Sequence, residues 1–63
     1  MTQPSPRRTA ALHRLPTLYA RALRLRDEGL SANGMAEALG VEPEAVGPLL
    51  AVAEAKLAAL LRD

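Results

Sequence analysis

Leucines and alanines spaced three and four residues apart, in segments separated by Gly or Pro, are the feature that most constrains this chain. Such spacing places apolar side chains along one face of an α-helix. Ala contributes 13 and Leu 12 of the 63 residues, and Tyr19 is the one aromatic residue. A chain of this length is one domain at most, so we expect a small all-α domain.

Gly and Pro divide the sequence into three expected helices, at 16–28, at 32–39 and from 43 or 48 to 62. Pro16 suits the first position of a helix, and Gly29 can adopt the positive φ that ends one. The expected apolar face of the first helix consists of Leu15, Leu18, Tyr19, Ala22 and Leu25.

The second helix has a good N-cap in Ser31, and Gly40 provides the tight turn after it. Its expected inward residues are Met35, Ala36 and Leu39. In the third helix, Pro48 lacks the N–H that would bond back to Glu44. We therefore favour a helical turn at 43–47 followed by a bent continuation. The expected core face of this helix consists of Val46, Leu50, Ala53, Leu57, Leu60 and Leu61.

The segment before the first expected helix is rich in Pro, Ser, Thr and Arg at its start. We expect residues 1–14 to be a basic, largely disordered arm, with one possible helical turn at 9–14. Residues 15–63 would then form a three-helix bundle.

The net charge of +1 hides a strong asymmetry along the chain. All seven acids fall in residues 27–63, together with only Lys56 and Arg62. Residues 1–26 have no acid and six arginines: Arg7, Arg8, Arg14, Arg21, Arg24 and Arg26. A basic half of this kind suits a polyanion such as duplex DNA, or an acidic protein face. The alternative is a solvated basic tail beside an acidic domain.

An ordered set of short sequence pieces between 15 and 61 resembles a known family. The pieces are Leu15-Pro16, Ala22-Leu23-Arg24-Leu25, Glu28-Gly29-Leu30-Ser31, Met35-Ala36-Glu37-Ala38-Leu39-Gly40-Val41, Ala45-Val46, Leu50, Ala53, Lys56-Leu57 and Leu60-Leu61. They resemble the helix-turn-helix of region four of bacterial sigma factors, which also occurs in response regulators and resolvases. The resemblance implies a DNA-binding protein of transcription regulation whose last helix enters the major groove.

This sequence departs from the family in the helix that reads the DNA. The positions that resemble the groove-facing ones are Glu44, Gly47, Pro48, Leu49 and Val52. None of these side chains can donate a bidentate hydrogen bond to a base edge, and Glu44 would be repelled by phosphate. We therefore expect the six arginines to hold the phosphate backbone, with weak sequence preference.

The third expected helix is also apolar on the side away from the core, where Ala51, Ala55, Ala58 and Ala59 lie with Val52 at the flank. A helix that is apolar all round is normally buried. The alternative function is therefore a protein-interaction module, binding a second copy or a transcription-machinery protein through Leu49, Val52, Ala55 and Ala59. A surface alanine is also simply a good helix former, so the composition alone leaves both interpretations open.

Several classes of function are not expected. The chain has no Cys and one His, so we expect no metal site and no cofactor. No pair of residues indicates catalysis, so we expect no enzyme and no small-molecule ligand. The longest apolar runs, 49–53 and 57–61, are far below the roughly 18 residues of a membrane span. With no secretory apolar segment after Met1, we expect a cytoplasmic protein.

Overall fold

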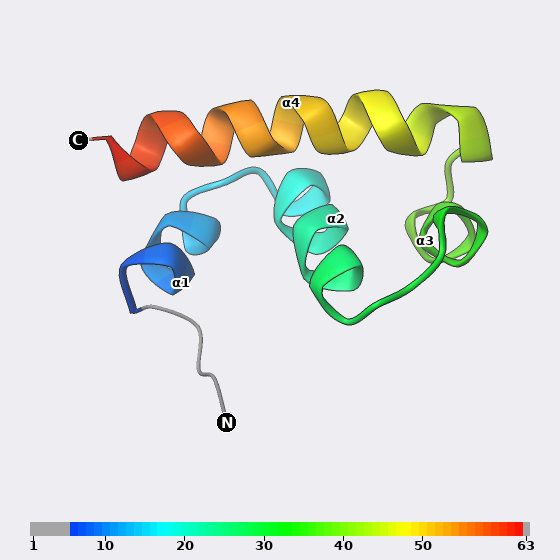
Figure 1. Cartoon of the computed structure of the whole chain (residues 1–63), viewed down its shortest axis with the longest axis horizontal. Helices are drawn as coiled ribbons and strands as arrows, with labels where there is room; N and C mark the ends of the chain where they lie inside the picture. The colour runs from blue at the N-terminus through cyan, green and yellow to red at the C-terminus, as the bar shows by residue number, and fades with distance from the viewer. Residues whose placement is uncertain (1–5, 63) are drawn as a thin grey trace.

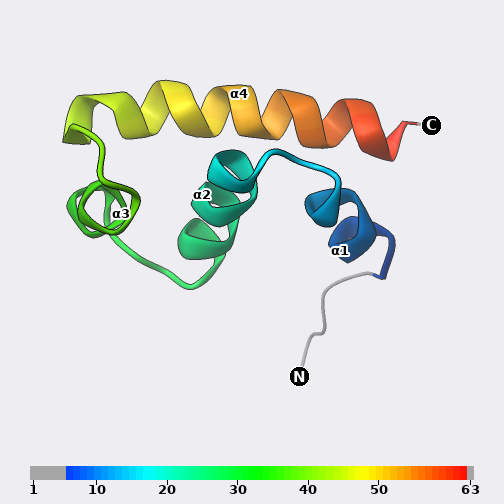
Figure 2. The same cartoon turned by 180° about the vertical axis from the view of Figure 1, so that it is seen from behind.

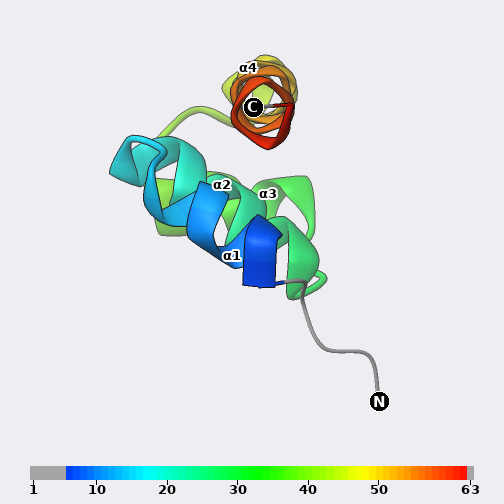
Figure 3. The same ribbon diagram turned by 90° about the vertical axis from the view of Figure 1, so that its left-hand side faces the viewer.

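Four helices in two layers make up the chain in a computed structural model that describes residues 6–62 (Figure 1). They are α1 (Pro6–His13), α2 (Thr17–Asp27), α3 (Ala32–Leu39) and α4 (Pro43–Leu61). The three shorter helices lie side by side beneath α4, which runs the length of the molecule (Figures 1 and 2). Seen along α4, they all lie on one side of it (Figure 3).

The first helix corrects two expectations. The described chain has four helices instead of three, and Pro6–His13 is a helix where we expected a largely disordered arm with one helical turn at 9–14. Ala11 and Leu12 are buried in the core beside α4, together with Leu15 just after the helix. The burial of this apolar face explains why a short segment is helical, because most helical stability in proteins comes from tertiary packing. Residues 1–5 of the expected arm lie outside the described residues.

The second helix begins one residue later than expected, because Pro16 is the N-cap and Thr17 the first helical residue. Its apolar face is also rotated from the expected one. Leu23 is completely buried, whereas Leu18 is 41% exposed. The expected face was therefore wrong at Leu18, while Leu15 and Ala22 are buried and Tyr19 and Leu25 are half-buried.

The third helix has the bounds that the sequence predicts. The Ser31 hydroxyl oxygen accepts a hydrogen bond from the backbone N–H of Gly34, 3.1 Å away. Gly40 closes the helix in the left-handed region at φ 70°, and Gly29 ends α2 at φ 90°. Both conformations are accessible to Gly without steric cost, so these two residues set the turns on either side of α3.

The fourth helix is one continuous helix from Pro43 to Leu61, so the expected helical turn at 43–47 is confirmed as its first part, and the expected bend after it stays a prediction. Pro48 lies inside it and is exposed, where its ring disturbs no packing of the core. The inward face is the expected one: Val46, Ala53 and Leu57 are buried, and Leu50, Leu60 and Leu61 are half-buried.

Two apolar clusters lie along the inner face of α4. One contains Leu23 and Leu57 among its buried residues, and the other contains Met35 and Val46. Leu50 of α4 packs against both clusters and so joins them. Because both clusters use α4, the position of each shorter helix depends on this one helix.

We expect Leu23→Ala to destabilise the domain by about 2–5 kcal/mol, because it empties a fully buried site. The matched variant Leu18→Ala, in the same helix, is expected to cost less than about 1 kcal/mol, because Leu18 is largely solvated. Urea unfolding followed by circular dichroism measures both, and equal costs would contradict the rotated face of α2.

Candidate functional site

The six arginines expected to bind phosphate do not form one surface. Arg7 donates a hydrogen bond to the backbone carbonyl of Leu61, which links α1 to the end of α4. Arg21 donates to the carbonyl of Ala38 at 3.0 Å, which links α2 to α3. Both arginines are exposed, and each guanidinium group therefore connects two helices at the surface of the same molecule.

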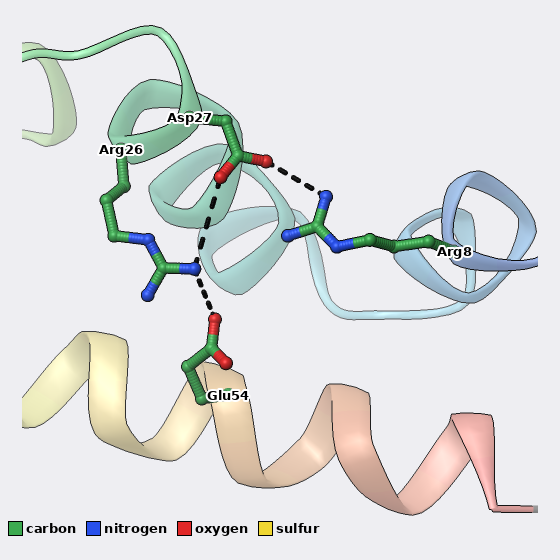
Figure 4. A network of polar contacts seen from close by, with 4 residues as sticks. All are labelled: Arg8, Arg26, Asp27 and Glu54. Carbon is green, nitrogen blue, oxygen red and sulfur yellow. Dashed lines mark hydrogen bonds and ion pairs between the residues drawn. The ribbon is translucent and has the colours of Figure 1, made fainter. Parts of the chain in front are cut away.

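Two more arginines meet acidic side chains near the end of α2 (Figure 4). Arg8 of α1 pairs with Asp27 at 2.9 Å. Arg26 pairs with Glu54 of α4 and reaches the other carboxylate oxygen of Asp27 at 4.0 Å. The side chains of Arg8, Arg26 and Glu54, which lie around Asp27, thus connect α1, α2 and α4.

This network gives Asp27 a structural role that its position in the sequence hides. An acid in the last turn of a helix lies at the negative end of the helix dipole and is slightly unfavourable there. Here the two guanidinium groups of Arg8 and Arg26 compensate for that position. Sequence reasoning missed the contact because Arg8 and Asp27 belong to different helices, and one of those helices was not expected.

Arg14 and Arg24 are the two arginines of the set without such a partner among residues 6–62. Arg14 and Lys56 line an open hollow of about 440 Å³ between the start of α2 and the last turns of α4. Arg7 and Arg14 line a neighbouring hollow against Leu60 and Leu61. Positive charge therefore gathers where α1 meets the C-terminal end of α4.

The opposite end of the molecule is acidic. Glu42 and Glu44 are exposed at the start of α4, and Glu37 is exposed in the adjoining last turn of α3. Among the positions that the resemblance predicts to face the DNA groove, Gly47, Pro48 and Val52 are also exposed. In the described part of the chain, this end of α4 thus presents carboxylates and small apolar groups where phosphate contact would need cations.

The side of α4 that points away from the core is exposed over the whole helix. We define the outer face of α4 as Glu44, Pro48, Ala51, Ala55, Ala58 and Arg62, with Val52 and Ala59 along one edge; all eight are exposed. Val52 is 43% exposed, which is unusual for a large apolar side chain in this fold. Of the four expected interface residues, Val52, Ala55 and Ala59 belong to this surface. Leu49 is half-buried against the core and contributes only its outer edge.

The spacing of the sequence placed four alanines on this face, but the charged residues at its two ends were not assigned to it. Glu44 and Arg62 lie on the same face, and the 100° advance per residue of a helix is the signal that would have shown it. Neither side chain forms an ion pair with another described residue.

Tyr19 is half-buried, as expected, and packs against the core. The ammonium group of Lys56 lies over its ring, 5.6 Å from the centroid. A cation at this distance is attracted to the face of the ring. The ring of Tyr19 therefore already has a cation against one of its faces.

No three His, Asp or Glu side chains in the described chain are grouped as metal ligands would be. None of the helices described above combines the length and apolar content that crossing a membrane requires. Comparisons with protein-family models, with curated proteins and with solved structures found no match.

We expect Asp27→Asn to lower the melting temperature by a few degrees at low salt, because it weakens two ion pairs. Each pair is worth about 0.2–1 kcal/mol, since the side chains are 29 to 44% exposed. Glu28→Gln is the matched control, because Glu28 forms no ion pair with another described residue. The difference between the two variants should shrink at about 1 M salt. Equal melting temperatures of Asp27→Asn and Glu28→Gln at low salt would contradict a stabilising role of the Asp27 ion pairs.

Proposed function

We propose that this chain is a helix-turn-helix module of the transcription machinery that acts by binding protein through the outer face of α4. The helix-turn-helix part of the proposal rests on α3, the short turn at Gly40, and α4. Ala36 and Val46 are buried together across this turn, so the two helices approach closely at a small residue. The resemblance to sigma region four runs through the same residues.

The uncovered outer face of α4 is the observation that carries the proposed protein contact. A surface helix of a soluble domain is normally polar on its outer side. Here the middle of that side has only Pro, Val and Ala side chains between Glu44 and Arg62. Covering these groups with protein removes apolar surface from water, which yields about 25 cal/mol per Å².

The same face is poorly suited to reading base pairs. Specific contacts in the major groove use donors such as Arg, Lys, Asn and Gln. The first half of α4 has none of these, and Glu37, Glu42 and Glu44 add negative charge at that end. Four of the six arginines also have partners within the domain. These observations favour a protein partner over a base pair.

Binding to the DNA backbone is the second candidate function, and one observation favours it. Arg14 and Lys56 line the same hollow near the C-terminal end of α4, and neither belongs to the outer face of that helix. A cluster of this kind can contact phosphates without reading sequence. In this arrangement the domain would touch DNA weakly and leave the outer face of α4 to its protein partner.

A photoreactive residue distinguishes the two partners directly. We expect Ala55→p-benzoylphenylalanine to crosslink to protein when the chain is irradiated in the cells that produce it, because Ala55 lies in the middle of the outer face. The same substitution at Ala10, exposed on α1, is the matched control and is expected to crosslink far less. Gel analysis with and without nuclease shows whether each product contains protein or DNA. Products of equal yield at both positions, or a DNA product at Ala55, would contradict the proposal.

For duplex DNA we expect binding only at low salt, with a shallow dependence on salt. About two phosphate contacts, from Arg14 and Lys56, give a slope of log K against log salt near −1.8, whereas six arginines would give about −5.4. Arg14→Ala should reduce the slope by about one contact, and Arg8→Ala should leave it unchanged, because Arg8 is paired with Asp27. Fluorescence anisotropy with a random-sequence duplex measures these slopes. A steep slope that both substitutions reduce equally would instead support a phosphate-binding surface made of all six arginines.

A further inference from the structure

We propose that the partner on the outer face of α4 is a second copy of this chain, packed antiparallel through α4, with Glu44 of each copy against Arg62 of the other. This inference rests on the proposed function, because it takes the outer face of α4 as a protein-binding surface. It adds the identity of the partner and the register of the two helices.

The spacing of the exposed residues supports helix-to-helix packing. Positions 44, 48, 51, 55, 58 and 62 follow one another at intervals of four, three, four, three and four. This is the alternation by which two helices pack along a continuous seam. Except at its two ends, the seam consists of Pro and Ala, whose small side chains allow the helix axes to approach closely.

The seam is self-complementary in one direction only. When two copies run antiparallel about a two-fold axis, position 44 faces 62, 48 faces 58, and 51 faces 55. Each end then joins a carboxylate to a guanidinium, and the middle joins alanine to alanine. A two-fold interface requires this kind of matching between a surface and itself.

A parallel arrangement has no such match. It would place Glu44 beside Glu44 and Arg62 beside Arg62, and like charges in contact are a strong element of discrimination. Aligned helix dipoles would also repel one another, whereas antiparallel dipoles attract. The charges at the ends of the seam therefore select the antiparallel form.

The fold leaves the seam accessible to a second copy. α1, α2 and α3 all lie on the far side of α4, so no other helix within residues 6–62 obstructs the seam (Figure 3). Neither Glu44 nor Arg62 is engaged by another described residue in an ion pair, so both charges remain available to a partner.

The surface area that the seam can bury limits the affinity of the dimer. At 1.5 Å per residue the stretch from 44 to 62 is about 27 Å long, and a strip about 10 Å wide covers roughly 300 Å² on each copy. Complexes that bury less than about 1,200 Å² in total are weak. We therefore expect a dissociation constant in the micromolar range or higher, and the measurement needs concentrated protein.

Charge reversal at the two ends tests the partner and the direction together. By sedimentation equilibrium up to millimolar protein, we expect the wild-type chain to dimerise. Glu44→Arg alone and Arg62→Glu alone should each weaken dimerisation at least tenfold, because each creates two like-charge contacts. An equimolar mixture of these two variants should form a heterodimer, because both end contacts are then of opposite sign. The double variant Glu44→Arg/Arg62→Glu should dimerise like the wild type.

Glu37→Arg is the matched control, because it reverses a charge on an exposed residue of α3, away from the seam. It should leave dimerisation unchanged, and circular dichroism should show that all variants remain folded, since no altered side chain is buried. A monomeric wild type at millimolar concentration would overturn the dimer, and single variants that dimerise as well as their mixture would overturn the antiparallel pairing of Glu44 with Arg62. If the benzoylphenylalanine product at Ala55 is then a different protein, the proposed function stands and only the homodimer fails. If Ala55 yields no protein product either, both fail.

Discussion

The packing of three short helices against a single long one is the constraint on which the structure depends. Both apolar clusters use side chains of α4, from Val46 at one end to Leu57 at the other. α4 can therefore present only one face to the core, and its opposite face lies in solvent along its full length (Figure 3). The middle of this solvent-facing side has Pro, Ala and Val side chains instead of charged ones, and this property connects the fold to a function.

The arginines show how composition and structure can suggest different roles for the same residues. In the sequence, six arginines within residues 1–26, a stretch that contains no acid, look like a surface for a polyanion. In the structure, Arg7, Arg8, Arg21 and Arg26 each connect two helices through a carbonyl or a carboxylate. Exposed ion pairs of this kind are individually weak. In a domain with few large core side chains, however, several weak links between helices matter to the relative placement of those helices.

Local signals predicted the parts of the fold that local chemistry decides. Ser31 and Gly40 define the bounds of α3, because a cap and a left-handed turn act within a few residues of the chain. The inner face of α4 followed from its spacing for the same reason. The helix Pro6–His13 was missed because its stability depends on Leu12 packing beside a helix some 40 residues away in sequence. Pro48 was expected to bend α4 because it lacks the N–H that would bond back to Glu44, and this helix continues through it, with buried side chains before and after it.

The candidate surface was predicted in part. Val52, Ala55 and Ala59 lie where their spacing placed them, whereas Leu49 is turned partly into the core. The central claim is that a second copy of the chain covers the outer face of α4. NMR with a soluble paramagnetic agent tests it most directly, by comparing the methyl groups of Ala51, Ala55 and Ala58 with those of the exposed Ala10 and Ala32. Protection of the three α4 methyl groups alone, increasing with protein concentration, is the predicted result. Equal accessibility of all five methyl groups at every concentration would contradict the claim.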